Sequence, residues 1–103
     1  MTITKAIRGL NYRSEADSGW RKVAWAVPAD HEIVEFQSWF AHTIQTQDAP
    51  RRYIQLREVL ASRYTELKVY RVPSRGRYNF LIYVMGEDSL GRLRGVQTMA
   101  VET

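Results

Sequence analysis

The chain of 103 residues contains no cysteine, which excludes a disulfide framework and a thiolate metal site. It also contains no apolar run that approaches the roughly 20 residues of a membrane-spanning helix. Residues 1–5 do not begin the long apolar stretch that precedes the cleavage site of a secretory signal. We therefore expect a cytoplasmic protein with no membrane partner.

Catalytic motifs are missing as well. No Gly-x-Ser-x-Gly sequence provides a serine nucleophile, and the glycines at 86, 91 and 95 are spaced for turns and a strand irregularity rather than for a phosphate-binding loop. His31 and Glu32 begin like a zinc protease motif, but Glu35 stands where its second histidine is required. We expect a protein that is not an enzyme and has neither a cofactor nor a metal site of its own.

The charges are divided unevenly along the chain. Residues 1–49 carry five Lys/Arg and six Asp/Glu, a net charge of −1, whereas residues 50–103 carry ten and five, a net charge of +5. A basic half is compatible with an anionic partner, and equally with a solvated surface that is rich in arginine. The length predicts one domain over residues 1–103.

The last third of the chain organises the predicted fold. Residues 78–85 are apolar at nearly every position and rich in aromatic and β-branched side chains, which predicts a strand buried on both faces. Turn residues flank this run, and residues 67–72 and 92–101 are strand-like on either side. The pattern predicts an antiparallel meander of three strands.

Earlier segments alternate between helix and strand. Helical spacing of apolar residues within positions 3–10 predicts a short helix, capped by Thr2 or Thr4, and residues 20–27 alternate as a strand. Asp30 and Asp48 are predicted N-caps of two further helices. Apolar residues at helical spacing predict the buried stripe of each helix: Ile33, Phe36 or Gln37, Phe40 and Ile44 in the first, and Tyr53, Leu56, Leu60 and Tyr64 in the second. The order helix-strand-helix-helix-strand-strand-strand indicates an α+β fold with a four-stranded, mainly antiparallel sheet covered by helices.

Two acidic segments are candidates for a binding site. One is the polar loop that contains Ser14, Glu15 and Asp17, and the other is the end of the sequence, where Glu102 and the α-carboxylate of Thr103 add two anionic groups. Carboxylate oxygens are the ligands that Mg²⁺ prefers. If the loop and the end of the sequence converge, an otherwise basic protein presents an acidic tip.

A basic surface is the alternative candidate. Aromatic side chains on an exposed sheet face could stack on nucleic-acid bases while neighbouring arginines hold phosphates, although burial is the commoner fate of such aromatics. The residues of this alternative nucleic-acid site are Arg71, Arg75, Arg77, Tyr78, Phe80, Arg92 and Arg94.

Several sequence blocks occur together: VYR at 69–71, YVMGE at 83–87, GRLRGVQT at 91–98 and VET at 101–103, with GL at 9–10 and SEAD at 14–17 before Trp20 and Trp25. With these blocks the sequence resembles the nuclease A inhibitor (NuiA-like) family. The resemblance implies a three-layer α/β/α sandwich that inhibits a sugar-non-specific, Mg²⁺-dependent nuclease by plugging its active site. Carried over, the loop glutamate is Glu15, and the carboxylate that reaches the Mg²⁺ of the partner belongs to Thr103. We expect a monomer when free. A regulatory interaction domain built on the same fold is a further alternative.

Overall fold

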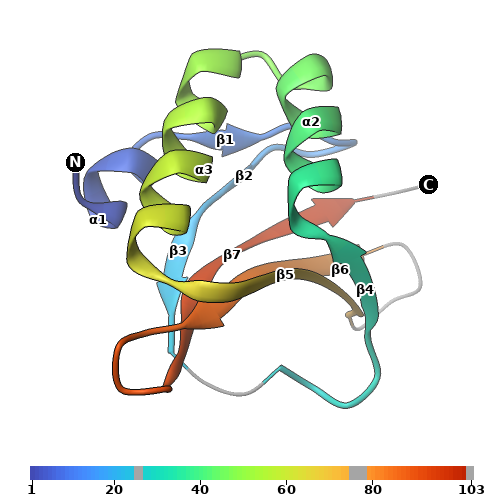
Figure 1. Cartoon of the computed structure of the whole chain (residues 1–103). Coiled ribbons are helices and arrows are strands. Elements are labelled where there is room, and N and C mark those ends of the chain that lie inside the picture. The colour runs from blue at the N-terminus through green and yellow to red at the C-terminus, as the bar shows by residue number, and fades with distance from the viewer. Residues whose placement is uncertain (25–26, 75–78, 102–103) are drawn as a thin grey trace.

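The computed structural model describes residues 1–24, 27–74 and 79–101. Along the chain, its helices and strands (Figure 1) are α1 (Ile3–Ile7), β1 (Asn11–Tyr12), β2 (Ser18–Gly19), β3 (Arg21–Val23), β4 (Glu32–Glu35), α2 (Phe36–Thr46), α3 (Pro50–Arg63), β5 (Thr65–Pro73), β6 (Asn79–Glu87) and β7 (Leu93–Val101). Within these ranges no helix has both the length and the apolar character to cross a membrane.

A five-stranded antiparallel sheet forms the centre of the molecule. Its strand order is β3-β7-β6-β5-β4, and β1 and β2 make a separate two-stranded sheet. In the middle strand, Val84 pairs with Val69 of β5 and with Val96 of β7. The predicted meander and the α+β class are confirmed. The predicted number of four strands is wrong, because β4 adds a fifth.

Strand β4 occupies residues that were predicted as the first turn of a helix. Ile33 fits the helical stripe of apolar positions, but in the structure it is 54% exposed on a strand that pairs with the edge of β5. Helix α2 begins directly after Glu35, whose carboxylate accepts hydrogen bonds from the backbone N–H groups of Gln37 (2.5 Å) and Ser38 (3.1 Å). The prediction of Asp30 as the N-cap is therefore wrong.

Helix α3 confirms its predicted buried stripe but not its predicted cap. Tyr53, Leu56 and Leu60 are fully buried. The cap position is Ala49, which makes no side-chain hydrogen bond, and the proline at the first helical position needs no partner for its nitrogen. Asp48, the predicted N-cap, forms an ion pair elsewhere.

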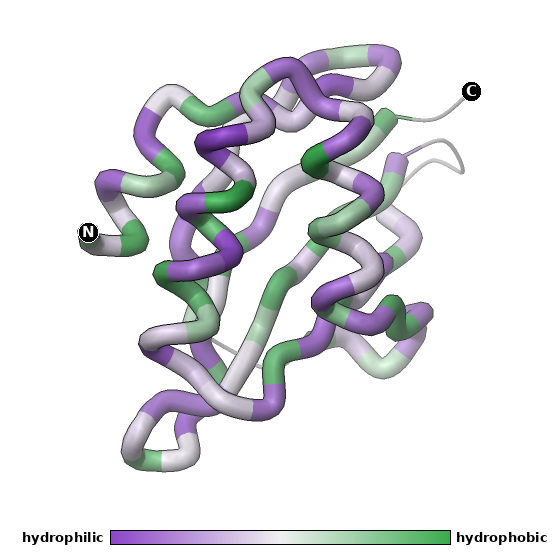
Figure 2. The backbone as a smooth tube through the Cα atoms, turned by 45° about the horizontal axis from the view of Figure 1, so that its top comes forward, coloured by the Kyte–Doolittle hydropathy of each residue, from purple (hydrophilic) through white to green (hydrophobic). Residues whose placement is uncertain are grey.

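Alternate residues of β6 face two separate hydrophobic clusters. Ile82 and Val84 point into a cluster to which all three helices contribute, whereas Tyr83 and Met85 point to the opposite face. In Figure 2, α2 and α3 lie side by side over one face of the sheet. On the opposite face, Val27 from the segment between β3 and β4 packs against the second cluster. Within the described ranges no helix contributes to that cluster, so the third layer of the expected sandwich is not seen.

The strands β6 and β7 approach each other closely at Gly95. A Cβ atom built on this residue would lie 1.9 Å from the carbonyl oxygen of Val84. Only glycine fits between the strands at this distance. Strand β7 then continues to Val101, where the candidate site begins.

Candidate functional site

The loop of residues 14–17 and the end of β7 lie together. The backbone N–H of Glu15 donates a hydrogen bond of 3.1 Å to the carbonyl of Val101, and the N–H of Val101 donates one of 2.9 Å to the Ser14 hydroxyl. Val101 is thus bonded to Glu15 through its carbonyl and to the Ser14 side chain through its N–H. We call residues 14–17 and Val101 the acidic tip. Glu102 and Thr103 follow Val101 in the chain and lie outside the described residues.

The loop is also attached to the connection between α2 and α3. The side-chain amide of Gln47 accepts a hydrogen bond from the Arg13 N–H (2.7 Å) and donates one to the Arg13 carbonyl (2.9 Å). Within the loop, the Ser14 hydroxyl donates to the carbonyl of Ala16 at 2.9 Å. These bonds fix the loop backbone on both sides, so its conformation is set before any partner binds.

The carboxylates of this region differ in how they are used. Arg13 pairs with Asp48, and its Nε lies 3.6 Å from a carboxylate oxygen of Asp17. The hydrogen bond to Asp48 raises the pKa of Arg13 above its ordinary value, so Arg13 stays cationic between the two carboxylates. Glu15 is exposed, and within the described part of the chain its carboxylate has no hydrogen-bond or ion-pair partner. Glu15 is therefore the carboxylate that the tip leaves available.

A buried aromatic cluster supports the acidic tip. The hydroxyl of Tyr53 accepts a hydrogen bond from the indole N–H of Trp20 (3.1 Å) and donates one to the Asn11 carbonyl (2.8 Å). Trp20 also makes edge contacts with Tyr12 and Trp39, with ring centroids 6.2 and 6.0 Å apart. Burial raises the pKa of Tyr53 to about 12. The sequence predicted Tyr53 as a core residue, but nothing local indicated its polar contacts with residues 11 and 20.

Among the described residues of the alternative nucleic-acid site, Arg71 and Phe80 lie apart from Arg92 and Arg94. The guanidinium of Arg71 lies 4.6 Å from the centre of the Phe80 ring, which itself packs partly against the helical core cluster. Arg94 pairs with Gly86, six positions from Phe80 along β6, so about 20 Å of strand separates the two groups. Arg92 forms an ion pair of 2.9 Å with Asp88. The predicted residues outside the described ranges are Arg75, Arg77 and Tyr78.

Comparison with known proteins identifies the family. A family model described as nuclease A inhibitor-like protein matches residues 31–103, and the chain belongs to this family. The match includes β4 to β7 and the end of the sequence, whereas the loop of residues 14–17 precedes it. No curated protein matches the chain. Inhibitors of this family are typically not enzymes, and no group of three or more His, Cys, Asp or Glu within the described ranges is placed to hold a metal ion.

Proposed function

We propose that this protein inhibits a sugar-non-specific, Mg²⁺-dependent nuclease by inserting its acidic tip into the active site. Glu15 presents its carboxylate to the site, while Glu102 and Thr103 enter beside it from the end of β7. The α-carboxylate of Thr103 approaches the Mg²⁺ of the nuclease. The observation that carries the proposal is the pair of hydrogen bonds that joins Ser14 and Glu15 to Val101.

The chemistry of a nuclease supports this role for carboxylates. A nuclease active site stabilises the negative charge of a phosphodiester with a metal ion and cationic groups. Carboxylate oxygens are hard ligands suited to Mg²⁺, so they can occupy the position of the phosphate oxygens. A carboxylate has no bond that the nuclease can cleave, and its binding therefore blocks the enzyme.

The rigidity of the loop adds to the proposal. A loop that is already ordered loses less conformational entropy on binding than a loop that must fold onto its partner. Gln47 and Val101 hold the loop backbone from opposite sides. Asp17, paired with Arg13, and Ser14, bonded to Val101, shape the tip and leave the carboxylate of Glu15 to contact the partner.

Inhibition assays on matched variants test the proposal. A Mg²⁺-dependent, sugar-non-specific nuclease is titrated with the protein ending at Thr103, with a form that carries several residues after Thr103, and with Glu15→Gln. The extension and Glu15→Gln are each expected to raise the inhibition constant at least about tenfold, which corresponds to about 1.4 kcal/mol. The control Glu58→Gln makes the same chemical change on an exposed position of α3 and should change the constant less than about twofold.

Folding must be followed in the same samples. Glu15 has no partner in the described part of the chain, so Glu15→Gln should leave the melting temperature unchanged. Loss of inhibition without loss of stability supports a contact role. Full inhibition by both the extended form and Glu15→Gln would refute insertion of the acidic tip.

The two other candidate functions have less support. A nucleic-acid surface made of Arg71, Phe80, Arg92 and Arg94 would have to join residues at opposite ends of the sheet. A regulatory domain would use the same tip on a partner that is not a nuclease. Failure to inhibit any Mg²⁺-dependent nuclease, together with binding of another protein that Glu15→Gln abolishes, would favour that second reading.

A further inference from the structure

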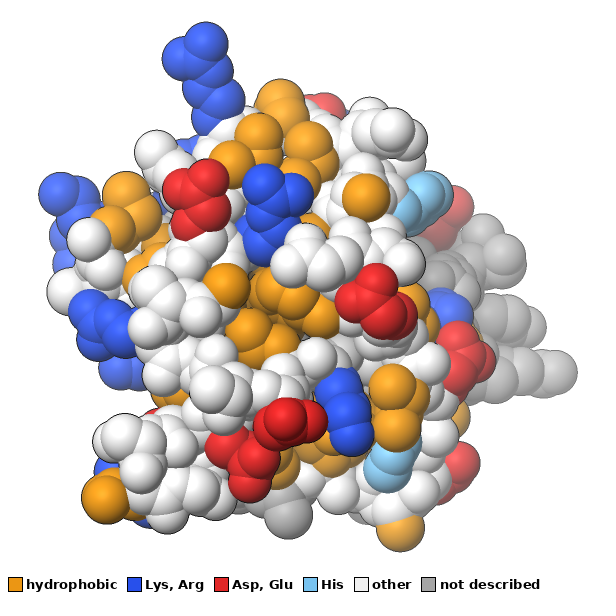
Figure 3. Space-filling model, viewed as in Figure 1, with side chains coloured by type: hydrophobic (Ala, Val, Ile, Leu, Met, Phe, Trp, Pro, Cys, Tyr) orange, Lys and Arg blue, Asp and Glu red, His pale blue; other side chains and the backbone are white. Residues whose placement is uncertain are grey.

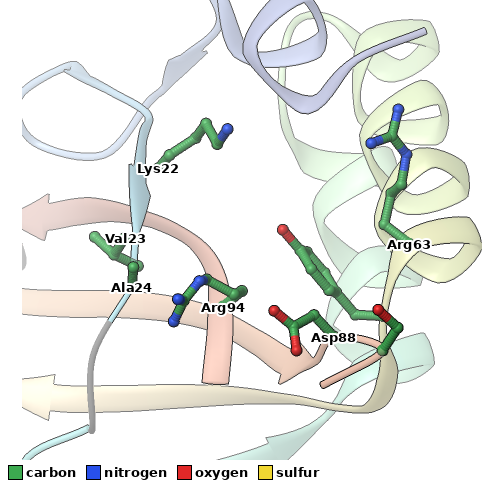
Figure 4. Close-up of a pocket in the computed structure, with 8 residues that line it drawn as sticks. Lys22, Val23, Ala24, Arg63, Asp88 and Arg94 are labelled. Carbon is green, nitrogen blue, oxygen red and sulfur yellow. The ribbon is translucent and has the colours of Figure 1, made fainter. Parts of the chain in front are cut away.

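A second site lies at the end of the sheet opposite to the acidic tip. A cavity of about 450 Å³ opens between β3, the C-terminal end of α3 and the turn that joins β6 to β7 (Figure 4). We call it the hairpin pocket. It is lined by Lys22, Val23, Ala24, Arg63, Tyr64, Asp88, Ser89 and Arg94.

Three cations from three different elements surround the hairpin pocket. Figure 4 shows Lys22 on the side of β3, Arg63 on the side of α3, and Arg94 on the strand between them. In the part of the chain that the structure describes, the side chains of Lys22 and Arg63 have no hydrogen-bond or ion-pair partner, and the side chain of Arg94 donates only to the backbone carbonyl of its neighbour Leu93 (2.8 Å). Like charges around one cavity repel each other, and a bound anion would relieve this repulsion.

The one carboxylate of the pocket is already occupied. Asp88 accepts hydrogen bonds of 2.9 Å from the backbone N–H groups of Leu90 and Arg92, and another of 2.9 Å from the Arg92 side chain. Arg92 therefore balances the charge of Asp88 within the turn. The charges of Lys22, Arg63 and Arg94 remain for a ligand.

We propose that the hairpin pocket binds the phosphate group of a nucleotide-sized ligand. Guanidinium groups offer paired N–H donors that match phosphate oxygens, and a lysine adds a further donor with a compact charge. The volume of the pocket falls within the range of small-molecule sites, about 300–1,000 Å³. The side chain of Tyr64 offers apolar contact to the rest of such a ligand.

The hairpin pocket is spatially independent of the acidic tip. Arg94 and Val101 are seven positions apart on β7, which corresponds to about 24 Å of antiparallel strand. A ligand in the pocket does not reach the tip. Ligand binding and nuclease inhibition can therefore be tested independently.

Binding is measured by NMR titration of the intact protein with adenosine 5′-monophosphate. Two further arms separate the sources of affinity: adenosine lacks the phosphate, and inorganic phosphate lacks the nucleoside. We expect the monophosphate to shift the amide signals of Lys22, Tyr64 and Arg94 and to bind at least about tenfold tighter than adenosine. If adenosine and its monophosphate bound equally tightly, the cations of the pocket would not be binding the phosphate group, and the proposal would be wrong.

A matched pair of variants localises the site. Lys22→Gln/Arg94→Gln should weaken binding of the monophosphate at least about tenfold, because it removes two of the three cations. Arg51→Gln removes an exposed cation at the other end of α3 and should weaken it less than about twofold. If Arg51→Gln weakened binding of the monophosphate as much as the double variant, the ligand would be held by non-specific attraction to a basic protein and not by the hairpin pocket.

Two controls complete the test. The double variant should inhibit the nuclease as well as the unchanged protein, since neither residue belongs to the acidic tip. A short single-stranded oligonucleotide should bind the pocket no more than about tenfold tighter than the monophosphate at 0.15 M salt. Much tighter binding, with a steep salt dependence and signal shifts that extend beyond the pocket, would overturn the small-ligand assignment and favour a nucleic-acid surface.

Discussion

The two ends of β7 use charged side chains in the same way but with opposite sign. At Val101, the cation of Arg13 is held between Asp17 and Asp48, and the carboxylate of Glu15 is left exposed. At the other end, the anion of Asp88 is held by the turn and by Arg92, and cations are left around the hairpin pocket. In each case one charge stabilises a loop while charges of the opposite sign face solvent.

This comparison explains why the net charge of +4 is a poor guide to the partner. In Figure 3, several Lys and Arg side chains project from the side of the molecule on which α1 lies, away from the end of β7. Under the proposed function, the basic surface would repel a positively charged nuclease at long range, and salt that screens this repulsion would let the partner approach the acidic tip. Association should therefore accelerate with salt up to about 0.15 M.

The largest effect is expected from Gly95→Ala, which damages both ends at once. The new methyl group would lie 1.9 Å from the Val84 carbonyl, so β6 and β7 must separate along their pairing. We expect a loss of about 3 kcal/mol or more in the free energy of unfolding, measured by urea denaturation. Gly19→Ala is the control, because a Cβ there meets no atom within 4 Å. Equal stability of the two variants would contradict the close approach.

A smaller effect is expected from Tyr53→Phe, in the aromatic cluster beside the acidic tip. The change leaves the Trp20 N–H and the Asn11 carbonyl without their buried partner and should cost about 1–3 kcal/mol. Tyr64→Phe is the matched control at the hairpin pocket, where no hydrogen bond of the Tyr64 hydroxyl is found among the described residues. It should change stability by less than about 0.5 kcal/mol.

The same pair of variants predicts a difference at high pH. The folded-state pKa of Tyr53 is raised from 10.0 to about 12, so the unfolded chain ionises first as the pH rises. The stabilisation from the neutral hydroxyl is complete below pH 10.0 and is lost between pH 10.0 and about 12. Tyr53→Phe should show a shallower loss of stability over this window than Tyr64→Phe. Parallel pH curves would argue that Tyr53 is solvated.

The smallest effect is expected from Asp88→Asn at the hairpin turn. The hydrogen bond from the Arg92 backbone lowers the pKa of Asp88 below 3.8, so its ionised form stabilises the fold above that pH. This contribution is lost as the pH falls through the lowered folded-state pKa. Because Asp88→Asn removes the carboxylate, acid unfolding below pH 3.8 should be less steep in the variant. If the free energy of unfolding falls equally steeply with pH in the variant and in the unchanged protein below pH 3.8, the turn does not depend on this charge.

The sequence predicts elements whose signals are local. Strand β6 carries a continuous apolar run, and α3 repeats its buried residues at helical spacing, so both were identified. Strand β4 was missed because Ile33 also fits a helical stripe and only the pairing with β5 decides between the two. Strands β1 and β2 have two residues each and depend on distant contacts, among them the bond from Tyr53 to Asn11.

The candidate site depends even more on distant contacts. Composition indicated two acidic segments, but their approach rests on bonds between residues 14–15 and 101, which no local pattern encodes. Asp48 illustrates the limit, because its position before a proline fits an N-cap while its carboxylate instead pairs with Arg13. Of the cations at the hairpin pocket, the sequence singled out only Arg94, as a candidate nucleic-acid residue. Lys22 and Arg63 are distant from it in the chain, so no local pattern indicated that the three lie around one cavity.

The carboxamide of Gln47 makes the attachment of the loop sensitive to deamidation. It acts as a substitute peptide group, donating to and accepting from the backbone of Arg13. Hydrolysis of this amide to a carboxylate would keep the acceptor but replace the N–H donor with an oxygen that repels the Arg13 carbonyl. Aged or alkali-treated protein would thus lose the bond from Gln47 to the Arg13 carbonyl, and a mass increase of about one dalton would report the event.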